Sequence, residues 1–237
     1  MTKKILVVGA HSADFVWRAA GTIATVTSQG GSASVIALSY GERGESGELW
    51  KEPNQTVENV KRIRHEEAQA AAEAVGADFH CLDLGDYPLN MTDAATEQLI
   101  DIFQDFAPNV VLTHNPVDPF NPDHPIASQM VQKARLLSTG AGVASAFNRI
   151  TPPGLYFFEP HQPELCDFKP NVFVDITPVM EKKIKAMDAM KAQGYLLQYY
   201  SDLASRRANH ARRISGMANV KFAEAHFRTL PWVVTGL

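Results

Sequence analysis

The stretch KILVVGAHSAD, residues 4–14, decides the fold. Its first six residues form a short apolar run that ends in glycine, which predicts a strand buried on both faces. Residues 14–29 then have a helical pattern, with Gly30-Gly31 as the stop. A buried strand that turns directly into a helix is typical of parallel α/β proteins, which bind ligands beyond the carboxyl ends of their strands.

The same alternation of strand and helix continues along the chain. Further strands are predicted at 33–39, 79–84, 109–113, 155–158 and 172–176, and further helices at 56–75, 92–107, 125–137, 178–193 and 201–217. Alternating elements imply βαβ units. We therefore expect one domain over residues 1–237, an α/β Rossmann-like, doubly wound, mostly parallel sheet flanked by helices, with polar loops at 40–55 and 114–123.

Composition excludes several classes of protein. The 237 residues carry 22 Lys and Arg against 26 Asp and Glu, a formal net charge of −4, so no electrostatic footprint for nucleic acid exists. Cys81 and Cys166 have no metal-binding spacing and make no disulfide framework. The N-terminal apolar run is too short for a signal peptide or a membrane span. The sequence therefore predicts a cytoplasmic protein that binds neither nucleic acid nor membrane.

The turn after the first strand lacks the G-x-G-x-x-G pattern of dinucleotide-binding folds, which argues against a nicotinamide cofactor. It carries His11 and Asp14 instead, and imidazole and carboxylate are good zinc ligands. The alternative is that Asp14 caps the helix beside a polar histidine.

A second polar loop follows the fourth predicted strand and ends in Asp123 and His124. If the first and fourth strands are neighbours, His124 comes within reach of His11 and Asp14. Two histidines and one carboxylate leave open positions, as a catalytic zinc site requires. The alternative is that Asp123 caps the next helix and that the loop histidines are ordinary polar residues.

These two motifs resemble those of the PIG-L/LmbE family of zinc-dependent deacetylases. That family has Ala-His-Pro-Asp-Asp after its first strand and His-Pro-Asp-His in the later loop, where this chain has AHSAD at 10–14 and NPDH at 121–124. The resemblance covers nearly the whole chain, and its supporting matches are the loop 41–47, the helix residues Arg64 and Glu67, and the strand segment 174–177.

The resemblance implies that His11, Asp14 and His124 bind Zn²⁺ and that the protein is a homo-oligomer, for which the apolar-rich segment 222–237 is a candidate surface. Two positions depart from the family pattern. Ala13 stands where the deacetylases have the acid that acts as general base, and Asn121 stands where they have the histidine that stabilises the oxyanion. Loss of a general base typically costs about 10²–10⁴-fold in rate, so a changed chemistry is indicated.

The stretch HSADFVWR at 11–18 and the stretch EPHQPE at 159–164 resemble one branch of the family, the 4-oxalomesaconate hydratases. This implies a hydro-lyase that adds water to the conjugated C=C bond of a tricarboxylic keto acid during gallate and protocatechuate breakdown. The alternative is a zinc-dependent deacetylase of N-acetylated sugars or small amides. A non-catalytic metal- or metabolite-binding module is a third possibility.

A hydratase without an acid at position 13 needs another base. The loop 40–55 is rich in acids, and from placement alone Glu48 is the first candidate and Glu45 the second. Each has the alternative of being a solvated loop acid. His161 is the candidate acid that protonates carbon, because histidine titrates near neutral pH; the alternative is a supporting hydrogen-bond role.

A substrate with three carboxylates needs donors and positive charge. Arg18, Arg43 and Arg64 lie near the predicted site loops, and a guanidinium binds a carboxylate through two hydrogen bonds. Arg64 matches a family position, although it could instead pair with Glu67 on the helix surface. We expect these arginines, together with Asn121, to bind the substrate.

Overall fold

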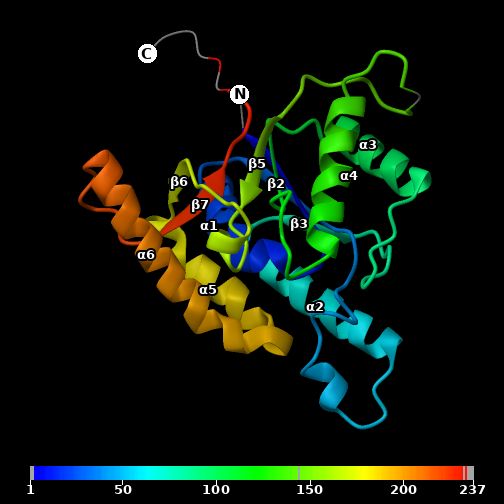
Figure 1. Cartoon of the computed structure of the whole chain (residues 1–237), viewed down its shortest axis with the longest axis horizontal. Coiled ribbons are helices and arrows are strands. Elements are labelled where there is room, and N and C mark those ends of the chain that lie inside the picture. The colour runs from blue at the N-terminus through cyan, green and yellow to red at the C-terminus, as the bar shows by residue number, and fades with distance from the viewer. Residues whose placement is uncertain (1–2, 144, 232, 234–237) are drawn as a thin grey trace.

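The computed structural model describes residues 3–143, 145–231 and 233. Within them, seven strands form one sheet in the order β3-β2-β1-β4-β5-β7-β6 (Figure 1). The strands are β1 Lys4–Gly9, β2 Ser32–Ala37, β3 Asp78–Cys81, β4 Val110–Thr113, β5 Gly154–Phe158, β6 Val172–Asp175 and β7 Ala223–Phe227. The α-helices are α1 Asp14–Ser28, α2 Val57–Val75, α3 Asp93–Phe106, α4 Asp123–Leu137, α5 Met180–Ala189 and α6 Leu197–Ser215, and the short 3-10 helices are η1 Leu49–Lys51, η2 Pro163–Leu165, η3 Thr177–Val179 and η4 Lys191–Leu196.

The first five strands confirm the predicted parallel sheet. β1 pairs in parallel with both β2 and β4, and β5 continues the sheet in parallel beyond β4. The strand order therefore reverses between β1 and β4, and their carboxyl ends border a crevice of the kind in which α/β proteins bind ligands.

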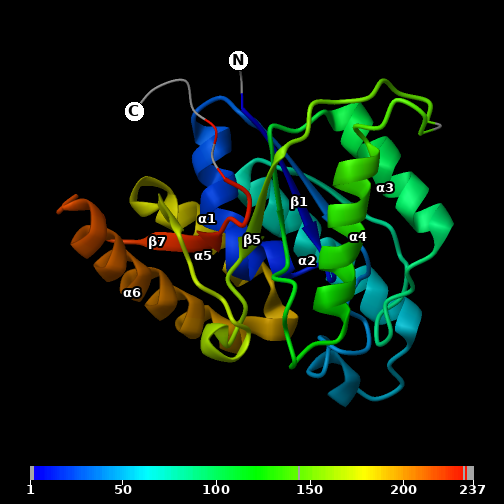
Figure 2. The same ribbon diagram turned by 45° about the horizontal axis from the view of Figure 1, so that its top comes forward.

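The sheet is buried between two layers of helices (Figures 1 and 2). α1, α2 and α5 cover one face, and α3 and α4 cover the other. Ile5 and Val7 of β1 point into the first apolar cluster, whereas Leu6 and Val8 point into the second, and all four are at most 1% exposed. β1 is thus a strand buried on both faces, as its continuous apolar run predicts.

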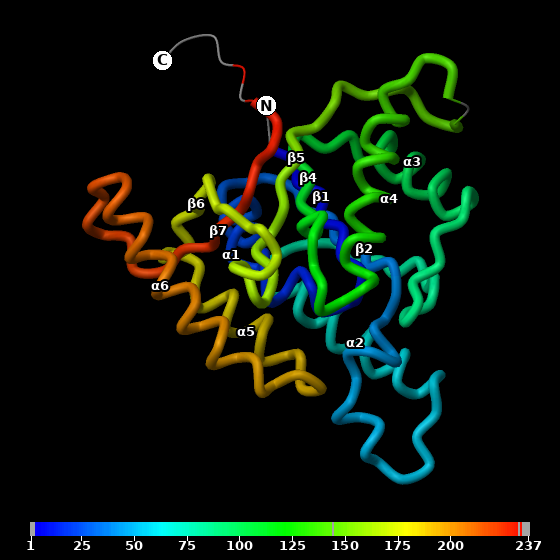
Figure 3. Tube along the Cα trace, in the orientation of Figure 1, coloured from blue at the N-terminus to red at the C-terminus, as the bar shows by residue number. Residues whose placement is uncertain are grey.

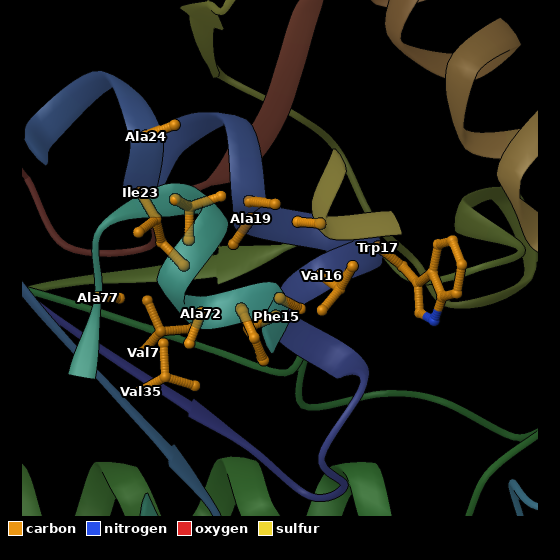
Figure 4. Close-up of a cluster of buried hydrophobic side chains, with 14 of the residues drawn as sticks. Val7, Phe15, Val16, Trp17, Ala19, Ile23, Ala24, Val35, Ala72 and Ala77 are labelled. Carbon is orange, nitrogen blue, oxygen red and sulfur yellow. The ribbon is translucent and has the colours of Figure 1, made fainter. Parts of the chain in front are cut away.

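One side chain of the first cluster lies apart from the rest. Figure 4 shows most of the labelled residues gathered between α1, α2 and the sheet, whereas Trp17 extends away from them. The Trp17 ring stacks on Tyr200 of α6, with 5.5 Å between the ring centroids. The start of α1 is therefore packed against the C-terminal part of the chain.

The segment 222–237 is a candidate subunit contact by its sequence, and the structure shows a different use for its first part. Residues 223–227 form β7, a strand absent from the sequence prediction, which runs antiparallel between β5 and β6. Ala223 and Ala225 of this strand are buried in the sheet, so this part of the segment packs within the chain. Residues 232 and 234–237 of the segment lie outside the described part of the chain.

A buried ion pair fastens β7 to α1 and α5. The Glu224 carboxylate accepts hydrogen bonds from the backbone N–H groups of Gly21 (2.9 Å) and Thr22 (2.7 Å), in the middle of α1. The Lys183 ammonium of α5 donates to Glu224 (2.6 Å) and to the backbone carbonyl of Trp17 (2.9 Å). A Cβ atom on Gly21 would lie 3.0 Å from the Glu224 carboxylate and 2.7 Å from Ile176, so the close approach requires glycine.

The helix predicted at 178–193 is shorter than expected. α5 ends at Ala189, and the 3-10 helix η4 follows, with Gln193 in a non-helical conformation (φ −129°, ψ 25°). α6 then begins at Leu197 rather than at 201. Among the described residues, no helix is both long and apolar enough to cross a membrane.

Candidate metal centre and active-site pocket

His11 and Asp14 lie in the tight turn that joins β1 to α1. The Asp14 carboxylate accepts a hydrogen bond from the His11 backbone N–H (2.8 Å), and Ala13, the residue that precedes α1, makes no side-chain cap. Asp14 folds back over Gly9, where a Cβ atom would lie 2.9 Å from the Asp14 Cβ. Asp14 is fully buried and faces the crevice, so the alternative of a simple helix cap does not describe it.

His124 arrives at the same place from the first turn of α4. Its Nε2 lies 3.6 Å from Asp14 Oδ1, and its ring centroid lies 5.4 Å from that of His11. On its other side, His124 Nδ1 lies 2.8 Å from Asp118 Oδ2. The pairing of β1 with β4 brings the two loops together, as expected from the sequence.

The loop after β2 adds a fourth side chain, Glu45. Glu45 Oε1 lies 3.2 Å from His11 Nδ1 and 3.8 Å from His124 Nε2. One ligand atom from each of His11, Asp14, Glu45 and His124 lies within 4.8 Å of the others. We refer to these four residues as the metal group.

Glu48, ranked first from placement alone, does not join the metal group. The chain enters η1 at Leu49, and Glu48 just before it lies on the surface, where it pairs with Lys51 at 2.6 Å. Figure 3 shows the loop between β2 and α2 extending well away from the sheet. Ser46 is still buried, but Gly47 and Glu48 are exposed, so of the two candidate acids only Glu45 reaches the crevice.

The charge distribution of this crevice suits a cation. Although burial opposes a charged ring, the carboxylates of Glu45, Asp123 and Asp14 raise the pKa of His11 well above its ordinary value. Burial opposes ionisation of Asp14 too, but His114, His124 and Arg18 together hold its pKa well below the usual range. Carboxylates in a site this dry are costly unless they are compensated by positive charge.

Two buried ring nitrogens also indicate a cation site in this crevice. His11 Nδ1 and His124 Nε2 make no hydrogen bond within the described part of the chain, although carboxylate oxygens lie nearby. Nitrogens that converge with carboxylates on one point, without a hydrogen bond to them, are arranged as ligands of a shared ion. Histidine nitrogens with carboxylate oxygens are a donor set that zinc accepts.

Two further residues hold the metal group in place. Asp123 Oδ2 lies 3.3 Å from His11 Nε2, and the Asp123 carboxylate accepts the backbone N–H groups of Tyr87 and Leu89, both at 2.9 Å. His114 Nε2 lies 2.9 Å from Asp14 Oδ2. Burial, helped by the neighbouring His124, lowers the pKa of His114 to about 3, so this imidazole is neutral.

A cavity of about 270 Å³ opens beside the metal group. Of the residues that the sequence predicts to bind substrate or to protonate carbon, Arg18, Asn121 and His161 line it. Arg18 donates to Asp14 Oδ1 (2.7 Å), and Asn121 Nδ2 donates to Glu45 Oε1 (3.4 Å). The remaining lining residues are Trp17, Glu45, Asp118, Phe120, His124, Gln162, Gln193, Tyr195, Leu196 and Tyr200.

His161 lines the cavity beside two adjacent tyrosines of α6. Its ring stacks on Tyr199 with 4.4 Å between centroids, and its Nδ1 lies 3.5 Å from the Tyr200 hydroxyl. Burial and the Arg18 guanidinium lower the pKa of His161 below its ordinary value. The side chain is only half-buried and faces the cavity.

A family model described as GlcNAc-PI de-N-acetylase matches residues 6–135 of this chain, which include the whole metal group. The chain belongs to the PIG-L family. A 4-oxalmesaconate hydratase of Pseudomonas putida is 42% identical to it over 99% of this chain and 92% of the relative. A diacetylchitobiose deacetylase of Thermococcus kodakarensis is 30% identical over 81% of this chain and 70% of the relative.

Two solved structures share this fold. The crystal structure of GalB, the 4-carboxy-2-hydroxymuconate hydratase from Pseudomonas putida KT2440, superposes with a TM-score of 0.96 at 42% identity, covering 99% of each chain. The conserved protein TT1542 from Thermus thermophilus has a TM-score of 0.78 at 23% identity, covering 97% of this chain and 96% of its own. The second likeness bears on the fold alone.

Two of the predicted substrate-binding arginines lie elsewhere in this PIG-L fold. Arg43 is exposed, and its backbone N–H donates to the buried Asp86, which anchors the loop. Arg64 is completely buried behind the cavity wall, where it donates to Glu67 (2.7 Å) and to Gln193 (2.8 Å). Neither arginine lines the cavity.

Several residues of the cavity wall are absent from the sequence prediction. Gln193, Tyr195 and Tyr200 line the cavity from η4 and α6. They belong to no chemical motif, and a single helix drawn through 178–193 hides the break that turns Gln193 inward. Only the packing of the C-terminal part against α1 brings them to the metal group.

Proposed function

We propose that this chain is a zinc-dependent hydratase that adds water to the conjugated C=C bond of 4-oxalomesaconate, giving 4-carboxy-4-hydroxy-2-oxoadipate in gallate and protocatechuate catabolism. The observation that carries the proposal is the replacement of one acid by another. Ala13, at the position of the deacetylase base, offers no proton acceptor, while the Glu45 carboxylate lies against His11 from a different loop. The full-length similarity to hydratases supports the same reaction.

His11, Asp14 and His124 would hold the zinc ion, with Glu45 beside it. When bound, zinc supplies a Lewis acid that stabilises negative charge developing on a keto or carboxylate oxygen of the substrate. The convergent geometry and the unpaired ring nitrogens His11 Nδ1 and His124 Nε2 support this assignment.

The proton transfers are assigned to two residues that line the same cavity. Glu45 accepts the proton of the attacking water through its carboxylate, in place of the first-ranked Glu48. His161 donates a proton from its imidazole to the carbon that does not receive the hydroxyl group. A separate base and acid in one cavity suit addition across a double bond, because each end of the bond needs a different group.

Arg18 and Asn121 are the proposed substrate-binding residues of the metal-side wall. The Arg18 guanidinium uses one nitrogen for Asp14, and its Nε makes no hydrogen bond to the described residues. A guanidinium held in this way presents donors to a carboxylate. A cytoplasmic location and a homo-oligomeric state remain predictions from the sequence.

A zinc-dependent deacetylase of N-acetylated sugars or small amides is the second candidate. The family and the metal group favour it, together with the similarity to a diacetylchitobiose deacetylase. Ala13 and Asn121 speak against it, because the acid and the histidine of the deacetylase pattern are both missing.

A paired assay on zinc-loaded and chelated protein separates the two reactions. One arm follows loss of the conjugated absorbance of 4-oxalomesaconate, and the other follows acetate release from N-acetylglucosamine-type substrates. We expect metal-dependent loss of absorbance and no acetate. Acetate release without any change of the conjugated acid would contradict the hydratase assignment.

A further inference from the structure

Gln193 lies at the break between α5 and α6 and contributes to the wall of the cavity. We infer that its side-chain N–H group binds a carboxylate of the substrate, and that buried Arg64 acts as a positioning residue that turns this amide toward the cavity. The inference rests on the proposed function, because it assigns a recognition group for a substrate that carries several carboxylates.

The position of Gln193 is fixed from α2 by a pair of buried residues. Arg64 is completely buried and its guanidinium donates to Glu67 Oε2 at 2.7 Å. The other Glu67 oxygen accepts the backbone N–H of Ala192 at 2.8 Å. Glu67 therefore holds the backbone next to Gln193, and the same carboxylate holds the guanidinium that contacts the Gln193 side chain.

The chemistry of arginine decides which way the amide faces. A guanidinium has only donors, so the group that it contacts at 2.8 Å must be the carbonyl oxygen of Gln193. The planar amide then directs Nε2 away from Arg64. Nε2 makes no hydrogen bond to the rest of the described chain, and it is not among the buried polar atoms that lack a partner. The free donor therefore faces the cavity that Gln193 lines.

A fixed neutral donor adds to the few substrate-binding groups of this cavity. Arg18 is the one Lys or Arg side chain among its described lining residues, and a substrate with three carboxylates needs donors beyond one guanidinium. The Asn121 amide shares its donor with Glu45 at 3.4 Å, and the exposed Gln162 side chain has no described contact that would hold it. Gln193 is only 5% exposed, so little rotamer freedom is left to lose when it binds an anion.

Matched substitutions at position 193 test the donor. Gln193→Glu keeps the contact to Arg64 but turns an acceptor oxygen toward the cavity, and Gln193→Met keeps the length without a donor. A hydrogen bond to a charged group contributes enough to change affinity by roughly tenfold to hundredfold. We expect KM for 4-oxalomesaconate to rise by about tenfold in Gln193→Met and by about a hundredfold in Gln193→Glu, with kcat within about threefold of the unchanged protein.

Arg64→Lys tests the positioning role. The lysine ammonium keeps the buried charge but cannot hydrogen-bond to Glu67 and Gln193 together. We therefore expect KM for 4-oxalomesaconate to rise while kcat stays unchanged. If Arg64 acts through Gln193, the double substitution Arg64→Lys with Gln193→Met raises KM no further than Gln193→Met alone. Additive effects of the two substitutions would overturn the positioning role.

Binding of tricarballylate, a tricarboxylate without keto group or double bond, gives a readout that needs no turnover. Calorimetry on the chelated full chain should show that Gln193→Met and Gln193→Glu both bind tricarballylate more weakly than the unchanged protein does. Gln193→Glu should bind it most weakly. Equal binding and equal KM in all three proteins would overturn the inference. If the unchanged protein does not hydrate 4-oxalomesaconate, the proposed function fails, while the tricarballylate comparison still decides the role of Gln193.

Discussion

The two halves of this sheet contribute different things to one cavity. Residues 3–137 form the parallel strands β1 to β4 and supply the whole metal group, from the loops after β1, β2 and β4. Residues 145–231 add the parallel strand β5 and the antiparallel strand β7, and they supply His161, Gln193 and Tyr200 to the cavity wall. The first half therefore holds the metal group and the proposed base, and the second half holds the proposed proton donor and much of the remaining wall.

Exchange of Glu45 for glutamine should have the largest effect. The amide side chain would fill the same space but accept no proton, so we expect kcat to fall by about 10²–10⁴-fold with little change in KM. The matched control is Glu48→Gln, three residues further along the same loop, where the side chain is exposed and paired with Lys51. Steady-state kinetics with 4-oxalomesaconate measure both.

The comparison of the halves breaks if the control behaves like the variant. Equal losses in Glu45→Gln and Glu48→Gln would mean that the loop rearranges on binding and that Glu48 reaches the cavity. If Glu45→Gln retains its kcat, Glu45 is not the base, and the first half of the sheet does not supply it.

The second half should also govern stability, through the ion pair of Glu224 and Lys183. Glu224→Ala leaves a buried ammonium without its partner, which typically costs about 3–5 kcal/mol of unfolding free energy. Urea denaturation of chelated protein measures this loss. Adding Lys183→Met should restore part of it, because the uncompensated charge disappears. If the double variant regains no unfolding free energy, the loss comes instead from the hydrogen bonds between Glu224 and α1.

A smaller effect is expected from pH, through His226 of β7. Burial, helped by the Lys183 ammonium, lowers the pKa of His226 to about 4 against the opposing charge of Glu224. The ordinary value is 6.5. Between pH 6.5 and 4 the unfolded chain therefore binds a proton that the folded chain does not, so stability falls as the pH falls, by about 3 kcal/mol in total.

Protonation of Glu224 also lowers the stability of the folded protein as the pH falls, but at a lower pH than His226. Although burial opposes its ionisation, Lys183 and His226 hold its pKa below the ordinary 4.5, and its contribution is lost only below that pH. His226→Gln can keep the contact to the Thr22 hydroxyl, which lies 2.8 Å from His226 Nε2. Denaturation of the chelated variant should show a flatter pH dependence between 6.5 and 4, and an unchanged slope would contradict the assignment.

The fold of the first half could be predicted because its signals are local. An apolar run such as 4–9 can only be a strand buried on both faces in an α/β chain, and Thr56 and Thr92 cap their helices as N-terminal signals suggest. β7 could not be predicted because an antiparallel strand inserted between two others depends on distant partners. The sequence predicts that the helix ends at 193, whereas α5 already ends at Ala189, and no glycine or proline marks this earlier end.

The candidate site divides in the same way. His11, Asp14 and His124 come together because motifs at strand ends and a strand pairing are readable from the sequence. The choice between Glu45 and Glu48 depends on where a loop turns outward, which no residue pattern reveals. Arg64 matches a family position, and only its burial reveals that it lies behind the wall instead of in the cavity.

The place of β7 has a consequence for how the molecule is made. It lies between β5 and β6, yet the ribosome synthesises it after both and after α5 and α6. A nascent chain stopped before β7 leaves β6 without a neighbour and the middle of α1 without Glu224. Translation must therefore reach β7 before the sheet can be completed. The first helix, α1, obtains its contact with Glu224 only at that late stage.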